Sequence, residues 1–234
     1  MTTAPRVAPR RAPLRPAAPL RLRALLPLAL LGLSACAQMD SVRVAGFGLH
    51  QDPGRPKTAR LATPPAPVAR PAAPLAQGFT ARDLLTGPTL RFDVSRTGGG
   101  VRVRQSDGCV WTRSGDWFAP SDSWAGCDDG ANWATGRAQV RRLASIWPLK
   151  PGAEGRWTRN ATSHTGRKYT RETVCRVTGA EAVIREGRAP TPAHVVVCAD
   201  GKRTRTTWYA AGEGPVAFRK SHEKHGVEEA WVRL

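Results

Sequence analysis

The chain has 234 residues and carries 36 Lys and Arg against 18 Asp and Glu, a formal net charge of +18. Residues 1–35 hold six of the arginines and no acid, whereas residues 79–234 hold 25 basic and 16 acidic residues, a net charge of +9. Such a balance favours polyanionic partners, namely lipid head groups, acidic glycans or nucleic acid. Because the N-terminal residues predict export, nucleic acid is excluded from the expected partners.

Residues 1–35 have the parts of an export signal, which needs a basic start, a short apolar core and a small-residue cleavage site. Arg21 and Arg23 close the basic part, and Ala24–Leu33 is a ten-residue apolar run. A membrane-spanning helix needs about 20 such residues, so the run is too short to be an anchor by itself. Cys36 follows the signal, and the segment Leu33–Cys36 (LSAC) resembles the lipobox of bacterial lipoproteins.

This resemblance implies that the thiol of Cys36 receives a diacylglyceryl group and that cleavage before Cys36 frees an amine for acylation. Two or more acyl chains anchor a protein stably to a membrane. In this family the next residue influences sorting, and Ala37 favours the outer membrane. We therefore expect a palmitoylated lipoprotein of the cell envelope, on the outer membrane and facing the periplasm. The alternative is an ordinary secretory signal that contains a cysteine.

Residues 37–78 are rich in Ala and Pro and show little apolar periodicity. Such a stretch cannot bury enough apolar surface to offset the entropy lost on ordering. Together with Cys36 it is predicted to form a disordered tether, residues 36–78, that holds residues 79–234 away from the membrane.

From Phe79 onward, short runs with alternating or β-branched residues are separated by Gly and Pro clusters, which is typical of antiparallel strands. The sequence predicts an all-β periplasmic domain over residues 79–234, a single curved antiparallel sheet or partial barrel. At most one short helix is expected, over Gly136–Ile146. The expected strands are Leu90–Val94, Val101–Arg104, Cys109–Thr112, Arg156–Arg159, Lys168–Val177, His194–Cys198, Arg203–Tyr209, Val216–Arg219 and Val227–Val232.

Four cysteines besides Cys36 lie in this domain, and an even number in an exported chain predicts two disulfides. Three pairings are possible, and we favour Cys109–Cys127 with Cys175–Cys198. A hairpin that turns near residues 186–187 would place Cys175 opposite Cys198, because the turn lies midway between them.

Five short motifs follow one another in the order Trp147–Gly152, Gly155–Trp157, Val177–Val183, Trp208–Ala210 and Gly214–Val216. This order resembles a group of uncharacterised exported bacterial proteins built on a curved antiparallel sheet. The resemblance implies a fold and a location, and it brings no catalytic residues. The Pro-rich segment 188–194 departs from the group's pattern, so the turn there is expected to differ.

Two basic strands carry arginines at alternate positions, Arg102 with Arg104 and Arg203 with Arg205. Alternate residues of a strand share a face, so each pair predicts a cationic stripe on a solvent-exposed face. Such a stripe could bind an anionic envelope polymer, and an ordinary solvated surface is the alternative.

The tryptophans at 117, 124 and 133 lie in a loop region rich in Gly, Asp and Ser. Aromatic rings on polar loops can stack on sugars, so Trp117 and Trp124 are candidate binding residues. The alternative is that these rings are part of the core.

No pattern predicts a catalytic, metal or cofactor site. In a strand, His222 and His225 would point to opposite faces, which opposes a shared metal. The aspartates at 107, 116, 122, 128 and 129 lack the spacing of a calcium loop. The Ser163-His164 and Ser221-His222 pairs lack a nucleophile-elbow motif.

The expected function is therefore a lipid-anchored binding or scaffolding module for an anionic envelope component such as peptidoglycan or lipopolysaccharide. The alternative is an envelope hydrolase acting on wall glycan. Two carboxylates converging in a pocket would favour the enzyme, and a flat basic face with no pocket would favour binding.

Overall fold

The structure is a computed structural model, and it describes residues 52, 54–71, 77–127 and 132–234. The predicted signal of residues 1–35 and the lipid-bearing Cys36 lie outside the described residues. In the part of the chain that the structure describes, no helix has the length and apolar character needed to cross a membrane.

The described residues form thirteen β-strands and no helix, so the all-β prediction is confirmed. The strands are β1 (Thr58–Arg60), β2 (Phe79–Asp83), β3 (Thr89–Thr97), β4 (Gly100–Gln105), β5 (Val110–Ser114), β6 (Ser123–Ala125), β7 (Gly136–Ala144), β8 (Glu154–Ser163), β9 (Lys168–Val183), β10 (Thr191–Asp200), β11 (Arg203–Ala210), β12 (Gly214–His222) and β13 (Gly226–Arg233).

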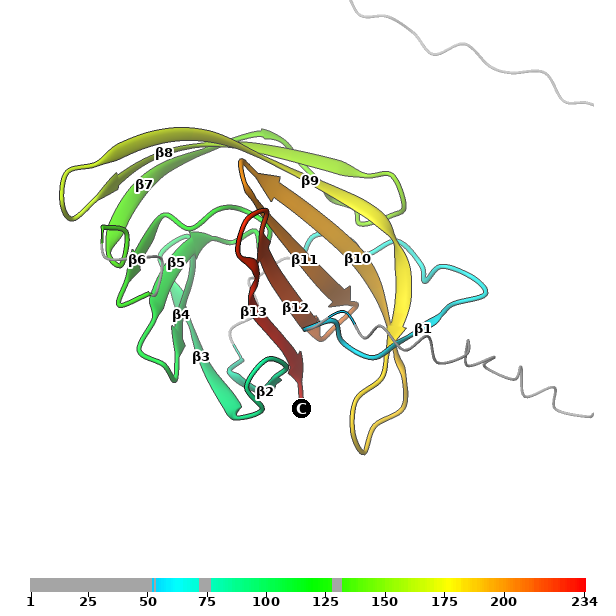
Figure 1. Cartoon of the computed structure of the whole chain (residues 1–234). Helices are drawn as coiled ribbons and strands as arrows, with labels where there is room; N and C mark the ends of the chain where they lie inside the picture. Colours follow the sequence, from blue (N-terminus) through cyan, green and yellow to red (C-terminus); the bar gives the residue numbers. More distant parts are fainter. Residues whose placement is uncertain (1–51, 53, 72–76, 128–131) are drawn as a thin grey trace, which may run out of the picture. The chain divides into compact units, whose positions relative to one another are not determined.

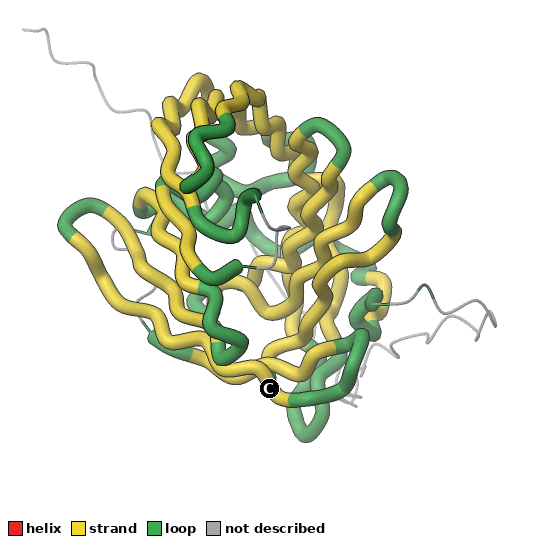
Figure 2. Tube along the Cα trace, turned by 60° about the vertical axis from the view of Figure 1, so that its left-hand side comes forward, coloured by secondary structure: helices red, strands yellow, loops and turns green. Residues whose placement is uncertain are grey.

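Strands β2 to β13 form a closed antiparallel barrel of twelve strands, in which each strand pairs with the next along the chain. The ring is closed by β13, which pairs with β2 through Trp231 opposite Asp83 and Arg233 opposite Ala81. Figures 1 and 2 show this meander as a curved wall that returns on itself. Closure leaves no unpaired edge along most of the sheet, and unpaired edges are where sheets add further chains.

Segment Gly136–Ile146, expected as a helix, is mostly strand β7, and this expectation is wrong. From Gly136 to Arg141 the half-buried and exposed positions of β7 alternate, and Ala138 lies opposite Ala161 of β8. The spacing of Val140, Leu143 and Ile146 fits a helix by itself. However, β8 pairs with β7 through backbone hydrogen bonds along the whole length of β7, and this pairing overrides a weak local preference for helix.

The barrel is too wide to be filled by strand side chains alone, since about eight strands give an interior that side chains just fill. Two loops fill one end of it, residues 115–122 between β5 and β6 and residues 145–153 between β7 and β8. From these loops Phe118, Ile146 and Leu149 pack with Trp157 and Tyr209 of the wall. This plugged end holds the largest apolar cluster, and the wider space lies toward the opposite end.

Residues 54–71 differ from the disordered tether that the sequence predicts. Strand β1 pairs with the end of β9, with Thr58 opposite Val183. Strand β8 pairs only with the first part of β9, through Arg176, so the end of β9 has backbone groups that need another partner. Strand β1 supplies these partners, and Arg55 adds an ion pair with Glu181 at 2.9 Å.

The chain then continues past the plugged end of the barrel. Val68 forms an isolated bridge with Leu149, and the carbonyl oxygen of Ala66 lies 3.2 Å from Nε2 of His194. His194 is almost fully buried, so this contact gives a buried imidazole a partner. Proline fixes the backbone of such a segment in advance, which lowers the entropy lost when it orders.

Both predicted disulfides are confirmed. Cys109 is bonded to Cys127 and Cys175 to Cys198. Cys175 and Cys198 are direct partners in the β9–β10 register, and the connection between these strands lies midway between them, as the hairpin argument requires. Each bond therefore joins neighbouring parts of the barrel wall.

Candidate functional site

The barrel encloses a cavity of about 560 Å³. Its lining combines inward-facing strand residues with Leu85, Thr86 and Asp107 from turns at the end opposite the plug. We call this end the mouth, and we call the part beside the loop residues Trp117 and Phe118 the floor. A volume of a few hundred cubic ångströms is the usual size of a small-ligand pocket.

On the floor, Arg113 of β5 lies between two tryptophan rings. Its guanidinium carbon is 4.0 Å from the ring centre of Trp111 and 5.0 Å from that of Trp117. One guanidinium nitrogen, Nη1, donates a hydrogen bond to the carbonyl oxygen of Trp117. Its Nε is buried and has no hydrogen-bond partner among the described residues. The rings hold the side chain in place and leave hydrogen-bonding capacity unused.

A second guanidinium, from Arg159 of β8, is held in the same way. Its carbon lies 4.4 Å from the ring centre of Trp124, and Nη1 donates to the hydroxyl of Tyr169 at 2.8 Å. Cation–π contacts of this kind are worth about 0.5–2 kcal/mol each, more when they are desolvated. Two arginines of the cavity are thus fixed by aromatic neighbours.

The third guanidinium belongs to Arg205 of β11, whose pairing partners Cys198 and Lys220 also line the cavity. Its Nη2 is buried and has no hydrogen-bond partner in the described part of the chain. In the ring of twelve strands β11 lies opposite β5, and β8 lies midway between them. Arg113, Arg159 and Arg205 therefore enter the cavity from three separate parts of its wall.

The electrostatics of the floor reflect this convergence. Burial, and after it the positive charge of Arg205, lowers the pKa of Arg113 to about 9, whereas the charges of Asp116 and Asp122 act in the opposite direction. A guanidinium with this pKa is still protonated at neutral pH. Burial also raises the pKa of the Asp122 carboxyl, against the lowering effect of Arg113 and Arg159. The floor is a site where positive charge is costly and a bound anion would relieve that cost.

At the mouth, by contrast, charges are paired. Arg203 forms an ion pair with Glu228 at 2.9 Å, and Lys220 approaches the same carboxylate at 3.5 Å. Arg171 lies 3.4 Å from Asp200. Burial raises the pKa of Glu228, but the hydrogen bond from Arg203 and the nearby Lys220 outweigh burial, so the pKa of Glu228 is lowered overall. The carboxylates of Asp83, Asp107 and Glu229 also line this end, so the excess of positive charge lies on the floor and not at the mouth.

Two of the predicted stripe residues are not on the surface, so that part of the prediction is wrong. Arg203 and Arg205 line the cavity, whereas Arg102 and Arg104 of β4 are exposed on the outside. Along β4 the buried positions are Val101 and Val103, which leaves the arginines outward. Along β11, in contrast, Arg203 and Arg205 occupy positions that face the cavity. Both strands alternate as predicted, but they present opposite faces to the solvent.

The structure brings Arg205 together with both predicted tryptophans. Trp117 and Trp124 line the cavity, so their rings face its interior. Sequence reasoning missed Arg113, Arg159 and Tyr169. A signal for the two arginines is present in the sequence, because Arg113 lies two residues after Trp111 and Arg159 two residues after Trp157, so each shares a strand face with a tryptophan. It could not be recognised without knowing which face is enclosed.

The remaining polar motifs lie elsewhere. The rings of His222 and His225 stack at 4.6 Å beside the β12–β13 turn, and Ser163 bonds to Thr165. No group of three or more His, Cys, Asp or Glu residues placed to hold a metal occurs among the residues that the structure describes. Asp128 and Asp129 lie outside these residues.

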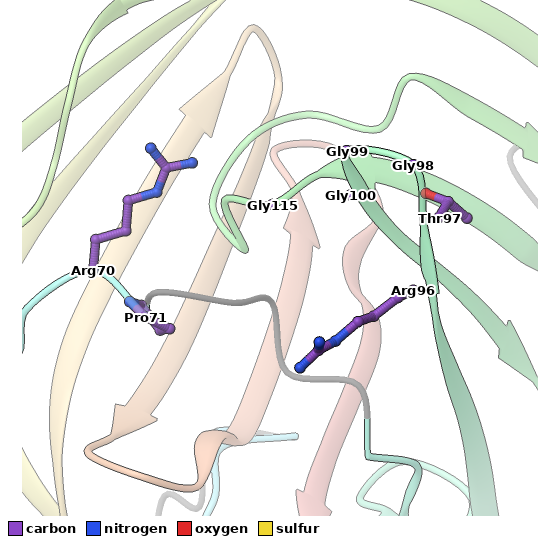
Figure 3. Close-up of a pocket in the computed structure, with 8 residues that line it drawn as sticks. All are labelled: Arg70, Pro71, Arg96, Thr97, Gly98, Gly99, Gly100 and Gly115. Carbon is purple, nitrogen blue, oxygen red and sulfur yellow. The ribbon is translucent and has the colours of Figure 1, made fainter.

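A second depression, of about 680 Å³, lies at the plugged end. Figure 3 shows Arg70 and Arg96 on either side of it, near the glycine-rich β3–β4 turn and Gly115. It has two arginines but no aromatic side chain in its lining. The barrel cavity is therefore the better-built candidate site.

Fold and site together define a class, an antiparallel meander barrel whose cavity has a cationic floor and aromatic walls. Comparisons with family models, with curated proteins and with solved structures found no match for this chain.

Proposed function

We propose that this protein is a lipid-anchored binding module of the cell envelope and that it takes an anionic envelope component into its barrel cavity. The observation that carries the proposal is the group of arginines on the floor, Arg113, Arg159 and Arg205. Two of them keep buried nitrogen atoms without a partner among the described residues. Unpartnered buried donors are costly, and an anion would satisfy them.

The lipid anchor and the envelope location rest on the N-terminal sequence alone. The basic outer surface is compatible with them, because anionic lipid and glycan surround any protein in that compartment. The cavity is a defined place for a ligand, and the sequence did not predict it. Its aromatic walls exclude water from the arginines, which strengthens their attraction for an anion.

A hydrolase acting on wall glycan is less well supported. Glycoside hydrolysis uses one carboxylic acid with a raised pKa and a second carboxylate across the bond. In the cavity, Glu228 has a lowered pKa and two basic partners, and Asp200 is paired with Arg171. These carboxylates balance neighbouring charges, which favours binding over proton donation.

The test is a binding titration of the full chain, purified from membranes in nonionic detergent. The probes are lipopolysaccharide and soluble peptidoglycan fragments, and the readout is quenching of tryptophan fluorescence, because several tryptophans line the cavity. At least one probe should bind saturably, and Arg205→Gln should weaken its binding about tenfold, equivalent to about 1.4 kcal/mol.

Arg102→Gln is the matched control, since it removes the same charge from an exposed position on the outer wall. Its affinity should stay within about twofold of the wild type. Buried charges are screened less than exposed ones, so added salt should weaken binding only moderately. Absence of binding to both probes at low salt would count against the proposal. So would a loss of affinity in Arg102→Gln but not in Arg205→Gln, because this would place the ligand on the outer stripe.

A further inference from the structure

The arrangement of the floor arginines restricts which anion can satisfy them. Arg113 and Arg205 come from opposite walls, β5 and β11, and Arg159 comes from the wall between them. A carboxylate is planar and presents its two oxygens to one side, where a single guanidinium can bind it with two parallel hydrogen bonds. Donors that approach from three directions match an anion with oxygens in three directions.

A phosphate monoester has this shape and charge. It has three terminal oxygens arranged tetrahedrally and carries a charge of about −1.5 to −2 at neutral pH. Arg113 and Arg205 each keep a buried nitrogen without a partner among the described residues, so each can add a hydrogen bond to the phosphate. Burial and, after it, repulsion from Arg205 lower the pKa of Arg113, and a dianion placed between the two guanidinium groups would offset that repulsion.

The wall above the floor restricts the rest of the ligand. It includes the half-buried ring of Trp133, with Trp124 stacked against it at 6.2 Å and Tyr169 tilted against it at 4.7 Å, and the Arg171–Asp200 ion pair. An acyl chain would remove water from these charged groups without replacing its hydrogen bonds, which is unfavourable. A sugar can place its C–H face on a ring while its hydroxyls bond to the charged groups.

From these contacts we infer that the cavity is a sugar-phosphate site, in which Arg113, Arg159 and Arg205 hold the phosphate monoester and the aromatic wall holds the sugar ring. This inference rests on the proposed function, because it names the chemistry of the anion in the same cavity. A phosphorylated glycolipid head group and a free sugar phosphate share this chemistry. A cavity of about 560 Å³ accommodates the head group and leaves a long acyl chain outside.

The test compares three small probes on the full-length protein, namely glucosamine 6-phosphate, glucuronate and uncharged glucosamine. Affinity is measured by tryptophan quenching and by the rise in melting temperature, since a ligand of the folded state stabilises it. Glucosamine 6-phosphate should bind at least tenfold more tightly than glucuronate, and glucosamine should not bind measurably in the same range. Phosphorylated glycolipid in micelles, competing with glucosamine 6-phosphate, distinguishes a lipid-borne source from a free one.

Two variants locate the phosphate. Arg205→Gln should reduce the affinity for glucosamine 6-phosphate at least tenfold, and the exposed Arg102→Gln should leave it unchanged. If Arg205→Gln does not fold, Arg205→Lys makes the same test, because lysine keeps the charge but lacks the planar fork. Glucuronate binding as tightly as the phosphate would overturn the sugar-phosphate assignment and leave the anionic-ligand proposal standing. If neither glucosamine 6-phosphate nor glucuronate binds, and the polymeric probes do not bind either, the sugar-phosphate assignment and the anionic-ligand proposal are both wrong.

Discussion

Tyr209 shows how one residue reports on the plugged end of the barrel. Its ring lies 5.5 Å from those of Phe118 and Trp147, measured between ring centres. Burial raises the pKa of its phenol to about 12, and the negative charge of Asp116 acts in the same direction. The ordinary value is about 10, so the folded state keeps the proton through a range in which the unfolded chain loses it.

This shift predicts a loss of stability in alkali. Between pH 10 and pH 12 the folded state binds more protons than the unfolded state at this site, so the free energy of unfolding falls as the pH rises. At pH 11 the loss from Tyr209 should be on the order of 1 kcal/mol relative to pH 8. Denaturant unfolding of the wild type and Tyr209→Phe at both values measures it. Equal pH dependence in the two proteins would contradict the assignment.

Among the arginines of the barrel strands, the surroundings differ more than the local sequence suggests. Arg113 is held between two rings, Arg203 is paired with Glu228, and Arg102 is exposed to solvent. Each lies in a strand with alternating character. Their different roles come from the face they occupy and not from their immediate neighbours in the chain.

At the scale of the element, the β9–β10 hairpin contributes both to the cavity lining and to the apolar cluster of the plugged end. Cys175 and Cys198 are direct partners in this hairpin, and Cys198 lines the cavity. Their bond closes a loop with a sequence separation of 23 residues. In the chain-entropy account, a bond over such a loop restricts the unfolded chain more than the folded one.

Removing this disulfide with the double substitution Cys175→Ala and Cys198→Ala should lower the free energy of unfolding by roughly 3 kcal/mol. Urea unfolding under oxidising conditions measures the change. The wild type treated with reductant is the control, and it should lose stability from both disulfides. A double variant as stable as the oxidised wild type would show that strand pairing alone holds this hairpin.

Strands β1 and β7 show where element-scale reasoning from sequence failed. The proline-rich segment around β1 has no apolar periodicity, yet it pairs with the end of β9, which β8 leaves unpartnered. Segment 136–146 has a spacing that fits a helix, yet β8 aligns it as a strand. In both cases a distant strand supplies the hydrogen bonds, and no local pattern carries that information.

For the whole molecule, the prediction concerns the lipid anchor, which would keep the barrel at a membrane. The Leu33–Cys36 sequence predicts acylation of Cys36. Wild-type protein should incorporate labelled palmitate and fractionate with membranes, whereas Cys36→Ser should lose both properties. Loss of the anchor should leave ligand affinity in the cavity unchanged, because the barrel contains all the proposed ligand contacts. Palmitate labelling that persists in Cys36→Ser would show that the lipobox resemblance is misleading.

The sequence by itself determined the all-β class and most of the strands, and among three possible disulfide pairings it favoured the one that the structure has. Strands are recognised because side chains alternate across a sheet, and the Cys175–Cys198 pair because a hairpin places residues equidistant from its turn opposite each other. These are local or nearly local relations. For this reason they could be read from the chain without knowing how the sheet closes.

Only the tertiary structure decided which face of each strand is enclosed, and with it the candidate site. The Arg102–Arg104 and Arg203–Arg205 pairs have the same alternating pattern, yet the first faces solvent and the second faces the cavity. Alternation defines two faces but does not say which one points inward, because this depends on register and on closure of β13 with β2. The closed ring brings arginines from β5, β8 and β11 into one cavity, and their meeting depends on contacts between residues far apart in the chain.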